Sequence, residues 1–468
     1  MTDPVDLEAS AQLVELAAGR LSVEALMEAT LARVAARNGA CNAVVSPRDP
    51  DEVMAEARAA DRAETRGPLH GLPVAIKDLA DAKGLPTSHG SPVFAGQIAQ
   101  GDSLHVARMR AAGAIIIGKT NTPEFGLGSH TYNPVHGATG NAYDPSVSCG
   151  GSSGGAAVAL AHGMVSLADG SDMMGSLRNP AGWNNVYGMR PSWGRVPSEP
   201  GDELYLHRLA TNGPMARSPR DMALFMSVIE GPGLQPEGWP FEPTLLPQGQ
   251  IGAARLGWLG DWDGAFAFEP GILDLCRGAA DVFGDLGCKV EDLAAPMPRE
   301  VIWDAWVTLR NFSNAAGKKP LLENPKTRDQ LKPEAVWEIE RGLGLSAMDL
   351  QAASAGRSAW FKRAMALFDE YDALLLPSAQ VWPFALDMPW PKAIAGQEMD
   401  TYHRWMEVVI CASILGLPAA CVPAGFGDNG LPMGLQIIGA PGRDQQVLEL
   451  AEAYHRASDW PGQRPPQG

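Results

Sequence analysis

Hydrophobic and polar positions divide the chain into stretches of different texture. Over residues 1–65 the apolar residues recur at helical spacing, and Ser22 can cap a helix whose end is marked by Arg37 and Gly39. The apolar face of that helix would carry Val23, Met27, Leu31 and Val34. We therefore expect a helical N-terminal segment that serves packing.

Between about residues 70 and 230, short apolar runs alternate with helical stretches and glycine-rich turns. Residues 72–76 predict a strand that ends in Lys77, and the continuous apolar run 114–117 predicts a strand buried on both faces. The other predicted elements of this core are helices over 103–112 and 154–162 and a strand over 165–168. Strand–helix–strand alternation indicates an α/β fold.

The later part of the chain changes texture twice. Residues 235–400 are less regular and rich in tryptophan, and we expect one or two of these side chains to line a substrate pocket while the others pack in the core. Residues 410–455 return to the core, with strands predicted over 419–423 and 433–439 and a helix over 444–455. No internal repeat or linker is visible, so a single domain over 1–468 is expected.

The composition is that of a globular enzyme, because 45% of the residues are hydrophobic and 19% are charged. The formal net charge is −17, and no cluster of Lys or Arg interrupts it. Such a surface repels the phosphates of nucleic acids and of anionic membranes. Neither a nucleic acid nor a membrane is therefore an expected partner.

Cysteine usage and the N-terminus point to a compartment. None of the six cysteines stands in a CxxC spacing, which argues against zinc and redox motifs, and six in so long a chain do not resemble a disulfide framework. The N-terminus lacks the apolar region of a signal peptide, and no apolar run reaches the roughly 18 residues of a membrane span. A reduced, cytoplasmic protein is the expectation.

A first unusual cluster combines glycine and serine directly before a predicted helix: Cys149-Gly150-Gly151-Ser152-Ser153-Gly154-Gly155. A phosphate-binding P-loop would need a Gly-Lys-Ser/Thr ending, and a flexible linker does not fit the apolar flanks. Residues 151–155 also match G-x-S-x-G, the nucleophile elbow of α/β-hydrolases, with Ser153 at its tip. The preceding residues 144–149 resemble a loop and not the strand that an elbow requires, but this interpretation stays open.

A second cluster, residues 169–181, directly follows a predicted strand. In it, Ser176 comes after a tight turn whose backbone N–H groups could converge on an oxyanion, each such donor contributing about 3–4 kcal/mol to acyl transfer. One predicted helix and one predicted strand connect the two clusters. Both serine loops can therefore meet at the same ends of the strands.

A nucleophilic serine needs a base. Neither cluster contains a histidine, and His162, at the end of a predicted helix, is interpreted as an ordinary, partly buried residue. Lys77 and Lys119 both end predicted strands, where desolvation lowers the pKa of an amine and favours its neutral form. These residues by themselves favour Lys77 only modestly.

Taken together, the residues resemble the amidase signature family. The signature of that family reads roughly G-G-S-S-G-G, a helix, and then G-T-D-x-G-G-S-I-R-x-P-A, to which residues 150–155 and 170–181 correspond. Similar blocks stand at 71–78, 118–125, 416–419 and 430–436, so the resemblance extends over about residues 10–455. It implies an α/β fold in which a large central mixed β-sheet is covered by helices on both faces.

The resemblance also implies a catalytic triad of Ser176, Ser152 and Lys77, with the peptide bond before Ser152 in the cis form. Neutral Lys77 would take a proton from Ser152 while Ser152 takes one from Ser176, and an acyl-enzyme would follow. The oxyanion hole would be lined by the backbone N–H groups of Met173, Met174, Gly175 and Ser176. No metal or organic cofactor is implied.

Other positions receive supporting roles by the same resemblance. Ser153 and Asp172 would order the loops by hydrogen bonding, and Arg178 would tie its loop to the structure. Lys119 falls on a structural block and loses its claim as the base. The family often has threonine and a small residue where Met173 and Met174 stand, so two flexible apolar side chains would narrow the site.

The expected function is hydrolysis of a small, fairly apolar amide, anilide or carbamate by an enzyme for which a homodimer is favoured. One alternative is the glutamine amidotransferase-type subunit of a tRNA transamidation complex, which needs partner subunits and against which the two methionines argue weakly. A second is an α/β-hydrolase-type esterase that uses Ser153. A catalytically inactive binding protein is disfavoured because all three triad positions are intact.

Overall fold

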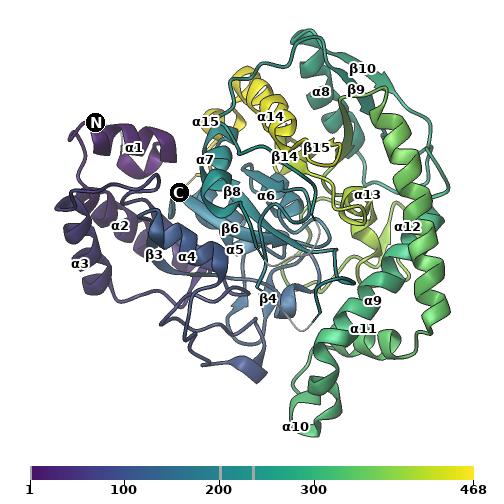
Figure 1. Cartoon of the computed structure of the whole chain (residues 1–468), viewed down its shortest axis with the longest axis horizontal. Coiled ribbons are helices and arrows are strands. Elements are labelled where there is room, and N and C mark those ends of the chain that lie inside the picture. The colour runs from purple at the N-terminus through teal and green to yellow at the C-terminus, as the bar shows by residue number, and fades with distance from the viewer. Residues whose placement is uncertain (1–2, 200–202, 234–237, 468) are drawn as a thin grey trace.

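The computed structural model describes residues 3–199, 203–233 and 238–467, and its centre is one large β-sheet (Figure 1). The strands of this sheet are β1 (Val44–Val45), β2 (Pro73–Lys77), β3 (Ile115–Thr120), β6 (Leu167–Asp172), β7 (Tyr187–Arg190), β8 (Thr211–Ala216), β9 (Arg255–Trp258), β10 (Lys289–Asp292), β11 (Ala373–Pro377), β14 (Ala419–Phe426) and β15 (Pro432–Gly439). They lie in the order β1-β3-β2-β6-β8-β7-β14-β15-β11-β9-β10. Two small ribbons pair β4 (Tyr132–Asn133) with β5 (Gly137–Ala138) and β12 (Ala393–Ile394) with β13 (Gln397–Glu398).

Helices cover both faces of the sheet. The α-helices are α1 (Ala9–Ala17), α2 (Val23–Cys41), α3 (Pro50–Asp61), α4 (Leu104–Ala111), α5 (Gly154–Ala161), α6 (Arg178–Trp183), α7 (Pro219–Ile229), α8 (Ile272–Asp285), α9 (Arg299–Glu323), α10 (Pro325–Arg328), α11 (Pro333–Leu343), α12 (Ala347–Phe368), α13 (Ile410–Ser413), α14 (Asp444–Ser458) and α15 (Trp460–Gln463). One group of helices is formed by α4, α7, α14 and α8, in which α4 contacts α7, α7 contacts α14 and α14 contacts α8. In a second group, α5 packs on α6. The predicted α/β fold with a mixed sheet is confirmed.

The arrangement of β2, β3 and β6 positions the site. β2 pairs in parallel with β3 and with β6, so the carboxyl ends of these strands lie at one edge of the sheet. Every residue of β2 and β3 is buried, as expected for continuous apolar runs covered on both faces. Lys77, at the end of β2, is thereby brought beside the end of β6, where Asp172 begins the second serine loop.

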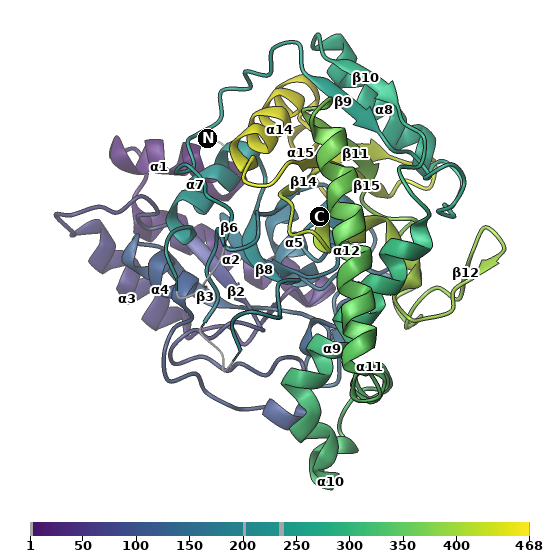
Figure 2. The same ribbon diagram turned by 45° about the vertical axis from the view of Figure 1, so that its right-hand side comes forward.

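Residues 235–400 contribute more to the fold than their texture predicts. They add β9, β10 and β11 to the main sheet, and they form the helices α9, α11 and α12, which pack on one another. These green helices lie at the opposite end of the molecule from the purple α1–α3, and α12 runs along the front in Figure 2. The sequence prediction named none of these three strands, and β10 is in addition only partly buried and carries charged residues, which obscures any apolar pattern.

The two-residue strand β1 was also missed, because Val44–Val45 is too short to show a period, yet it pairs with Thr120 and Lys119 of β3. The main hydrophobic core reaches from Val5 to Tyr454. All six cysteines are buried and unpaired. Among the described residues, no group of side chains suits a metal ion, and no helix is long and apolar enough to cross a bilayer.

Candidate active site

The two serine loops and Lys77 meet at the carboxyl edge of β2 and β6. The Nζ atom of Lys77 lies 2.8 Å from the Oγ of Ser152, 2.8 Å from the Oγ of Ser153 and 3.1 Å from the Oγ of Ser171. The lysine side chain is buried, with 1% of the residue exposed. Serines of both clusters therefore lie at the strand end that carries Lys77.

The first serine loop is held by hydrogen bonds to its backbone. The Gly151–Ser152 peptide bond is cis. The hydroxyl of Ser129 donates to the carbonyl oxygen of Gly151 at 2.6 Å, and the hydroxyl of Thr131 donates to that of Gly150 at 2.8 Å. The backbone N–H of Ser153 donates to the carbonyl oxygen of Ser176 at 3.2 Å, so the two loops are tied directly to each other.

Ser176 is the most accessible of the three serines. It is 6% exposed, whereas Ser152 is 2% and Ser153 0% exposed. Among the described residues, nothing forms a hydrogen bond with the Ser176 hydroxyl. The turn before it requires glycine, because Gly175 has φ +78°, and a Cβ there would lie 2.8 Å from a side-chain carbon of Val409.

The second serine loop offers one free backbone N–H fewer than the sequence analysis expected. The N–H of Gly175 donates to the Asp172 carboxylate at 2.9 Å, so it is already occupied and is not a free oxyanion donor. The N–H groups of Met173, Met174 and Ser176 form no hydrogen bond to any residue that the structure describes. The Met174 side chain is buried in the core, and only that of Met173 is partly exposed.

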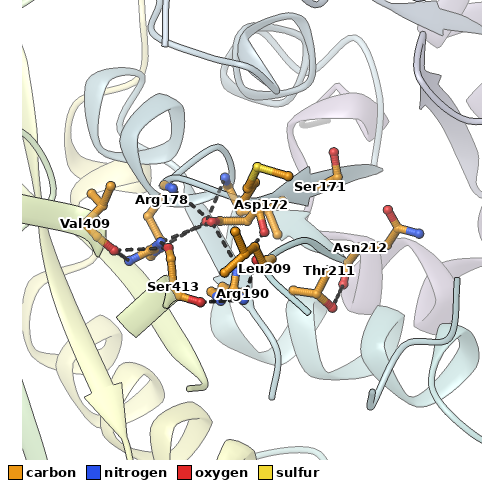
Figure 3. A network of polar contacts seen from close by, with 12 residues as sticks. Ser171, Asp172, Arg178, Arg190, Leu209, Thr211, Asn212, Val409 and Ser413 are labelled. Atoms are coloured by element: carbon orange, nitrogen blue, oxygen red, sulfur yellow. Dashed lines mark hydrogen bonds and ion pairs between the residues drawn. The ribbon is translucent and has the colours of Figure 1, made fainter. Parts of the chain in front are cut away.

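A buried ionic network fixes the same loop (Figure 3). The Asp172 carboxylate accepts from Nε and Nη2 of Arg178 at 3.0 and 3.1 Å and from the N–H of Leu177 at 3.2 Å, and it lies 3.3 Å from Nη1 of Arg190. Arg178 also donates to the Val409 carbonyl and the Ser413 hydroxyl, whose positions Figure 3 shows. Arg178 is fully buried, in agreement with a structural role and not with substrate binding.

The charges in this network shift each other's pKa. Burial alone would raise the pKa of the Asp172 carboxyl, but the guanidinium groups of Arg178 and Arg190 outweigh it and hold that pKa well below its usual range. Burial lowers the pKa of Arg190 to about 10, with Asp172 acting in the opposite direction. Asp172 therefore stays ionised and keeps its hydrogen bonds to the loop at neutral pH.

Lys77 is in the opposite situation, because its amine forms no ion pair with a carboxylate among the described residues. Burial lowers its pKa to about 7, and the more distant charges of Asp169 and Asp172 only partly oppose this. A substantial fraction of Lys77 is therefore neutral at physiological pH, which is the state that can accept a proton.

The sequence analysis gave no role to Asp169 and His105, which lie next to Lys77. An Asp169 oxygen accepts the backbone N–H of Lys77 at 2.7 Å, and the other lies 3.0 Å from Nε2 of His105. Asp169 and Ser171 are alternate residues of β6 on the side of Lys77. The sequence prediction ended this strand at Ala168 and placed Asp169 in the second serine cluster, so its contacts with Lys77 and His105 were not identifiable from the sequence.

The other residues considered as base or nucleophile are Lys119, His162 and Ser153, and their contacts do not favour those roles. Nζ of Lys119 donates to the Ala80 carbonyl at 2.7 Å and lies 3.5 Å from Asp78, so it serves the structure of the neighbouring loop. His162 caps the end of α5 and borders a different hollow from Lys77. Ser153 follows a loop, and its buried hydroxyl contacts Lys77 and not a histidine, which does not support a nucleophile elbow.

Aromatic side chains surround the approach to the first loop. A small hollow beside Ser129 is lined by Leu127, Gly128, His130, Tyr132, Lys332, Glu334, Pro389, Trp390, Tyr402 and Trp405. Nη1 of Arg310 donates a hydrogen bond to the sulfur of the partly exposed Met173 at 3.4 Å. Arg310 also forms an ion pair with Glu338 at 2.7 Å. The region 235–400 thus reaches both serine loops, and Trp390 is one of its tryptophans beside the site.

Comparisons with known proteins show to which family the chain belongs. A family model described as Amidase matches residues 25–448, and the chain belongs to the amidase signature family. The solved structure of a bacterial aryl acylamidase of the amidase signature family superposes with a TM-score of 0.90 at 30% identity, covering 98% of this chain and 99% of that one.

Two curated relatives are similar over nearly their whole lengths. One component of the glutamyl-tRNA(Gln) amidotransferase of Chloroflexus aurantiacus is 32% identical, covering 99% of this chain and 99% of its own. An acylamidase of Rhodococcus erythropolis is 32% identical, covering 98% of this chain and 97% of its own. The chain is an amidase signature hydrolase that acts on carbon–nitrogen bonds other than peptide bonds.

Proposed function

We propose that this enzyme hydrolyses a small, fairly apolar amide, anilide or carbamate through Ser176, Ser152 and Lys77 and an acyl-enzyme. The observation that carries the proposal is the 2.8 Å contact between Nζ of Lys77 and Oγ of Ser152. It joins a buried amine of lowered pKa to a serine whose loop is bonded to that of Ser176.

In the first half of the reaction, neutral Lys77 accepts the hydroxyl proton of Ser152, and Ser152 accepts that of Ser176. The Ser176 oxygen then attacks the substrate carbonyl carbon. The negative charge that develops on the carbonyl oxygen is met by the unoccupied N–H groups of Met173, Met174 and Ser176. Because no side chain is needed as a donor, the methionines are compatible with this role.

In the second half, the proton passes from Lys77 through Ser152 to the leaving nitrogen, since an amide nitrogen leaves as an amine. The carbon–nitrogen bond breaks, and the acyl group remains as an ester on Ser176. Water then loses a proton to the same relay and attacks the ester, which releases the carboxylic acid and restores the Ser176 hydroxyl. Each proton taken up by Lys77 is returned, so the enzyme ends unchanged.

The surroundings of the serines support this substrate class. Aromatic rings make up much of the lining of the hollow beside Ser129, with one lysine and one glutamate, Lys332 and Glu334, among them, and Met173 adds a flexible apolar surface. The similarity to acylamidases is consistent with an apolar acyl or aryl group.

A glutaminase function within a transamidation complex is the second candidate, because a component of a glutamyl-tRNA(Gln) amidotransferase is among the similar proteins. Glutamine carries two charged groups that must be recognised, whereas Arg310 near Met173 is already paired with Glu338. Release of ammonia from glutamine without hydrolysis of any anilide would favour this second function.

The proposal is tested without knowing the substrate by labelling with a fluorophosphonate and mapping the modified peptide. We expect one adduct, on Ser176, whose formation is slowed at least about 100-fold in Lys77→Met, because the base is then missing. An adduct on Ser153 that forms equally fast in Lys77→Met would contradict the triad.

The rate of this labelling is expected to depend on pH through Lys77. Since only the neutral amine is active and its pKa is about 7, the rate should fall about tenfold per pH unit below that value and level off above it. Asp169→Asn removes a negative charge that raises this pKa, so the acid limb should move to lower pH. A limb at the same pH in both enzymes would rule out Lys77 as the titrating group.

A further inference from the structure

A second cavity, separate from the serine loops, lies between α9 and α12. Its volume is about 870 Å³, and its walls come from these two helices and from segments around Trp193, Trp239 and Leu415. Figure 2 shows α9 and α12 side by side at the front of the molecule, and the two helices pack on each other. None of Lys77, Ser152 and Ser176 lines it.

Flat aromatic side chains form much of its wall. Trp239 stacks on Phe361 of α12 with ring centroids 6.0 Å apart and an interplanar angle of 11°. Phe312 of α9 and Trp193 line the same space. Stacked and edge-on rings of this kind offer surfaces for a planar hydrophobic group.

The charged side chains that line this cavity in the described part of the chain are all basic. Its charged lining residues are Arg208, Arg357 and Lys362, and no carboxylate lines it among the described residues. This contrasts with the whole chain, where 54 acidic residues exceed 37 basic ones. Arg208 lies over the ring of Trp193, 5.2 Å from its centroid, which places a cation directly against an aromatic wall.

Arg357 is the basic residue of this cavity that an anionic ligand would stabilise most. It is half-buried, and no described residue forms an ion pair or a hydrogen bond with its guanidinium group. Burial, followed by the charge of Arg208, lowers the pKa of Arg357, so its positive charge is poorly compensated. An arginine in such a position is suited to bind a carboxylate with two parallel hydrogen bonds.

We propose that this cavity is a binding site for an aromatic carboxylate, distinct from the site at Ser176. The ring lies against Trp239, Phe361 and Phe312, and the carboxylate meets Arg357. The site holds its occupant as a ligand and does not transform it, because the Ser358 hydroxyl in its wall donates to the Ser354 carbonyl of the same helix and not to a base.

The test is a calorimetric titration of the full-length enzyme with 2-naphthoate after Ser176 has been blocked with a fluorophosphonate. We expect one molecule to bind per chain, at least about tenfold more weakly in Arg357→Gln, and similarly weakly when 2-naphthylmethanol replaces the anion. Arg363→Gln is the matched control: it lies on the same helix but its Nε donates to the Pro296 carbonyl, outside the cavity, so affinity should be unchanged.

Two results would overturn the proposal. One is equal affinity in Arg357→Gln and in the unaltered enzyme, and the other is loss of naphthoate binding when Ser176 is blocked, which would place the ligand in the catalytic site. Should Arg357→Gln fold poorly, Lys362→Gln and Trp239→Leu test the same charge and wall from exposed or half-buried positions. If Ser176 cannot be labelled at all, the same variants are titrated without the blocking step. Failure of the proposed triad and failure of this binding site therefore give different results.

Discussion

Ser176→Ala is expected to lower kcat/KM for a chromogenic anilide by about 10⁴- to 10⁶-fold, the largest functional effect of any single substitution considered. The substitution removes the atom that attacks the carbonyl but leaves the loop intact, because Asp172 holds the N–H groups of Gly175 and Leu177 independently of the Ser176 side chain. Binding of the substrate should therefore change little.

The matched control is Ser153→Ala, which changes the other serine considered as nucleophile. Its hydroxyl is 2.8 Å from Nζ of Lys77, so its loss should disturb the lysine and reduce kcat/KM by about 10- to 100-fold. Steady-state kinetics on the two purified variants, with the KM and kcat effects separated, provide the measurement. A larger loss in Ser153→Ala than in Ser176→Ala would return the elbow esterase as the better interpretation.

Asp172→Asn is expected to lower the free energy of unfolding by about 3–5 kcal/mol, because it leaves two buried arginines without their counter-charge. The side chains of Asp172, Arg178 and Arg190 are all fully buried, so water cannot replace the lost carboxylate. Urea titrations of the variant and the unaltered enzyme give the difference.

An exposed ion pair is the appropriate comparison. Asp292 pairs with Arg277, but 77% of its side chain is exposed, and Asp292→Asn should cost less than about 1 kcal/mol. The contribution of Asp172 should also depend on pH. Because its folded-state pKa is lowered, this contribution is present above the unfolded-state value near 4 and is lost as the pH falls through the folded-state pKa. Equal losses of stability in both variants would show that the network does not brace the oxyanion loop.

The sequence predicted the parts of the fold that have strong periodicity and clear stops. The apolar runs that became β2 and β3 and the alanine-rich helix α5 are recognisable because burial on both faces excludes polar residues from them. The same reasoning missed several strands, and β1 and β10 show why. These strands take their conformation from pairing with β3 and β9, and pairing partners distant in the sequence leave no local pattern.

In the candidate site, too, some residues were recognisable from local sequence and others only from tertiary contacts. Glycine–serine loops before a helix and after a strand signalled Ser152 and Ser176, and the end of a buried strand signalled Lys77, because these are local features of the chain. The support by Asp169 and His105, and the use of the Gly175 N–H by Asp172, could not be anticipated. They depend on how the side chains of β6, α4 and the loop are oriented once β2 and β6 are paired.

By itself, the sequence determined the family, the α/β class and the residue types available for acyl transfer, since this chemistry requires particular side chains at fixed local spacings. Only the tertiary structure decided which lysine reaches the serines, which N–H groups remain free, and that Arg357 lies in the same cavity as Trp239 and Phe361. The physical reason is that desolvation and hydrogen bonding depend on all atoms within a few ångströms, and these come from segments as far apart in the chain as Lys77, Ser176 and Arg357.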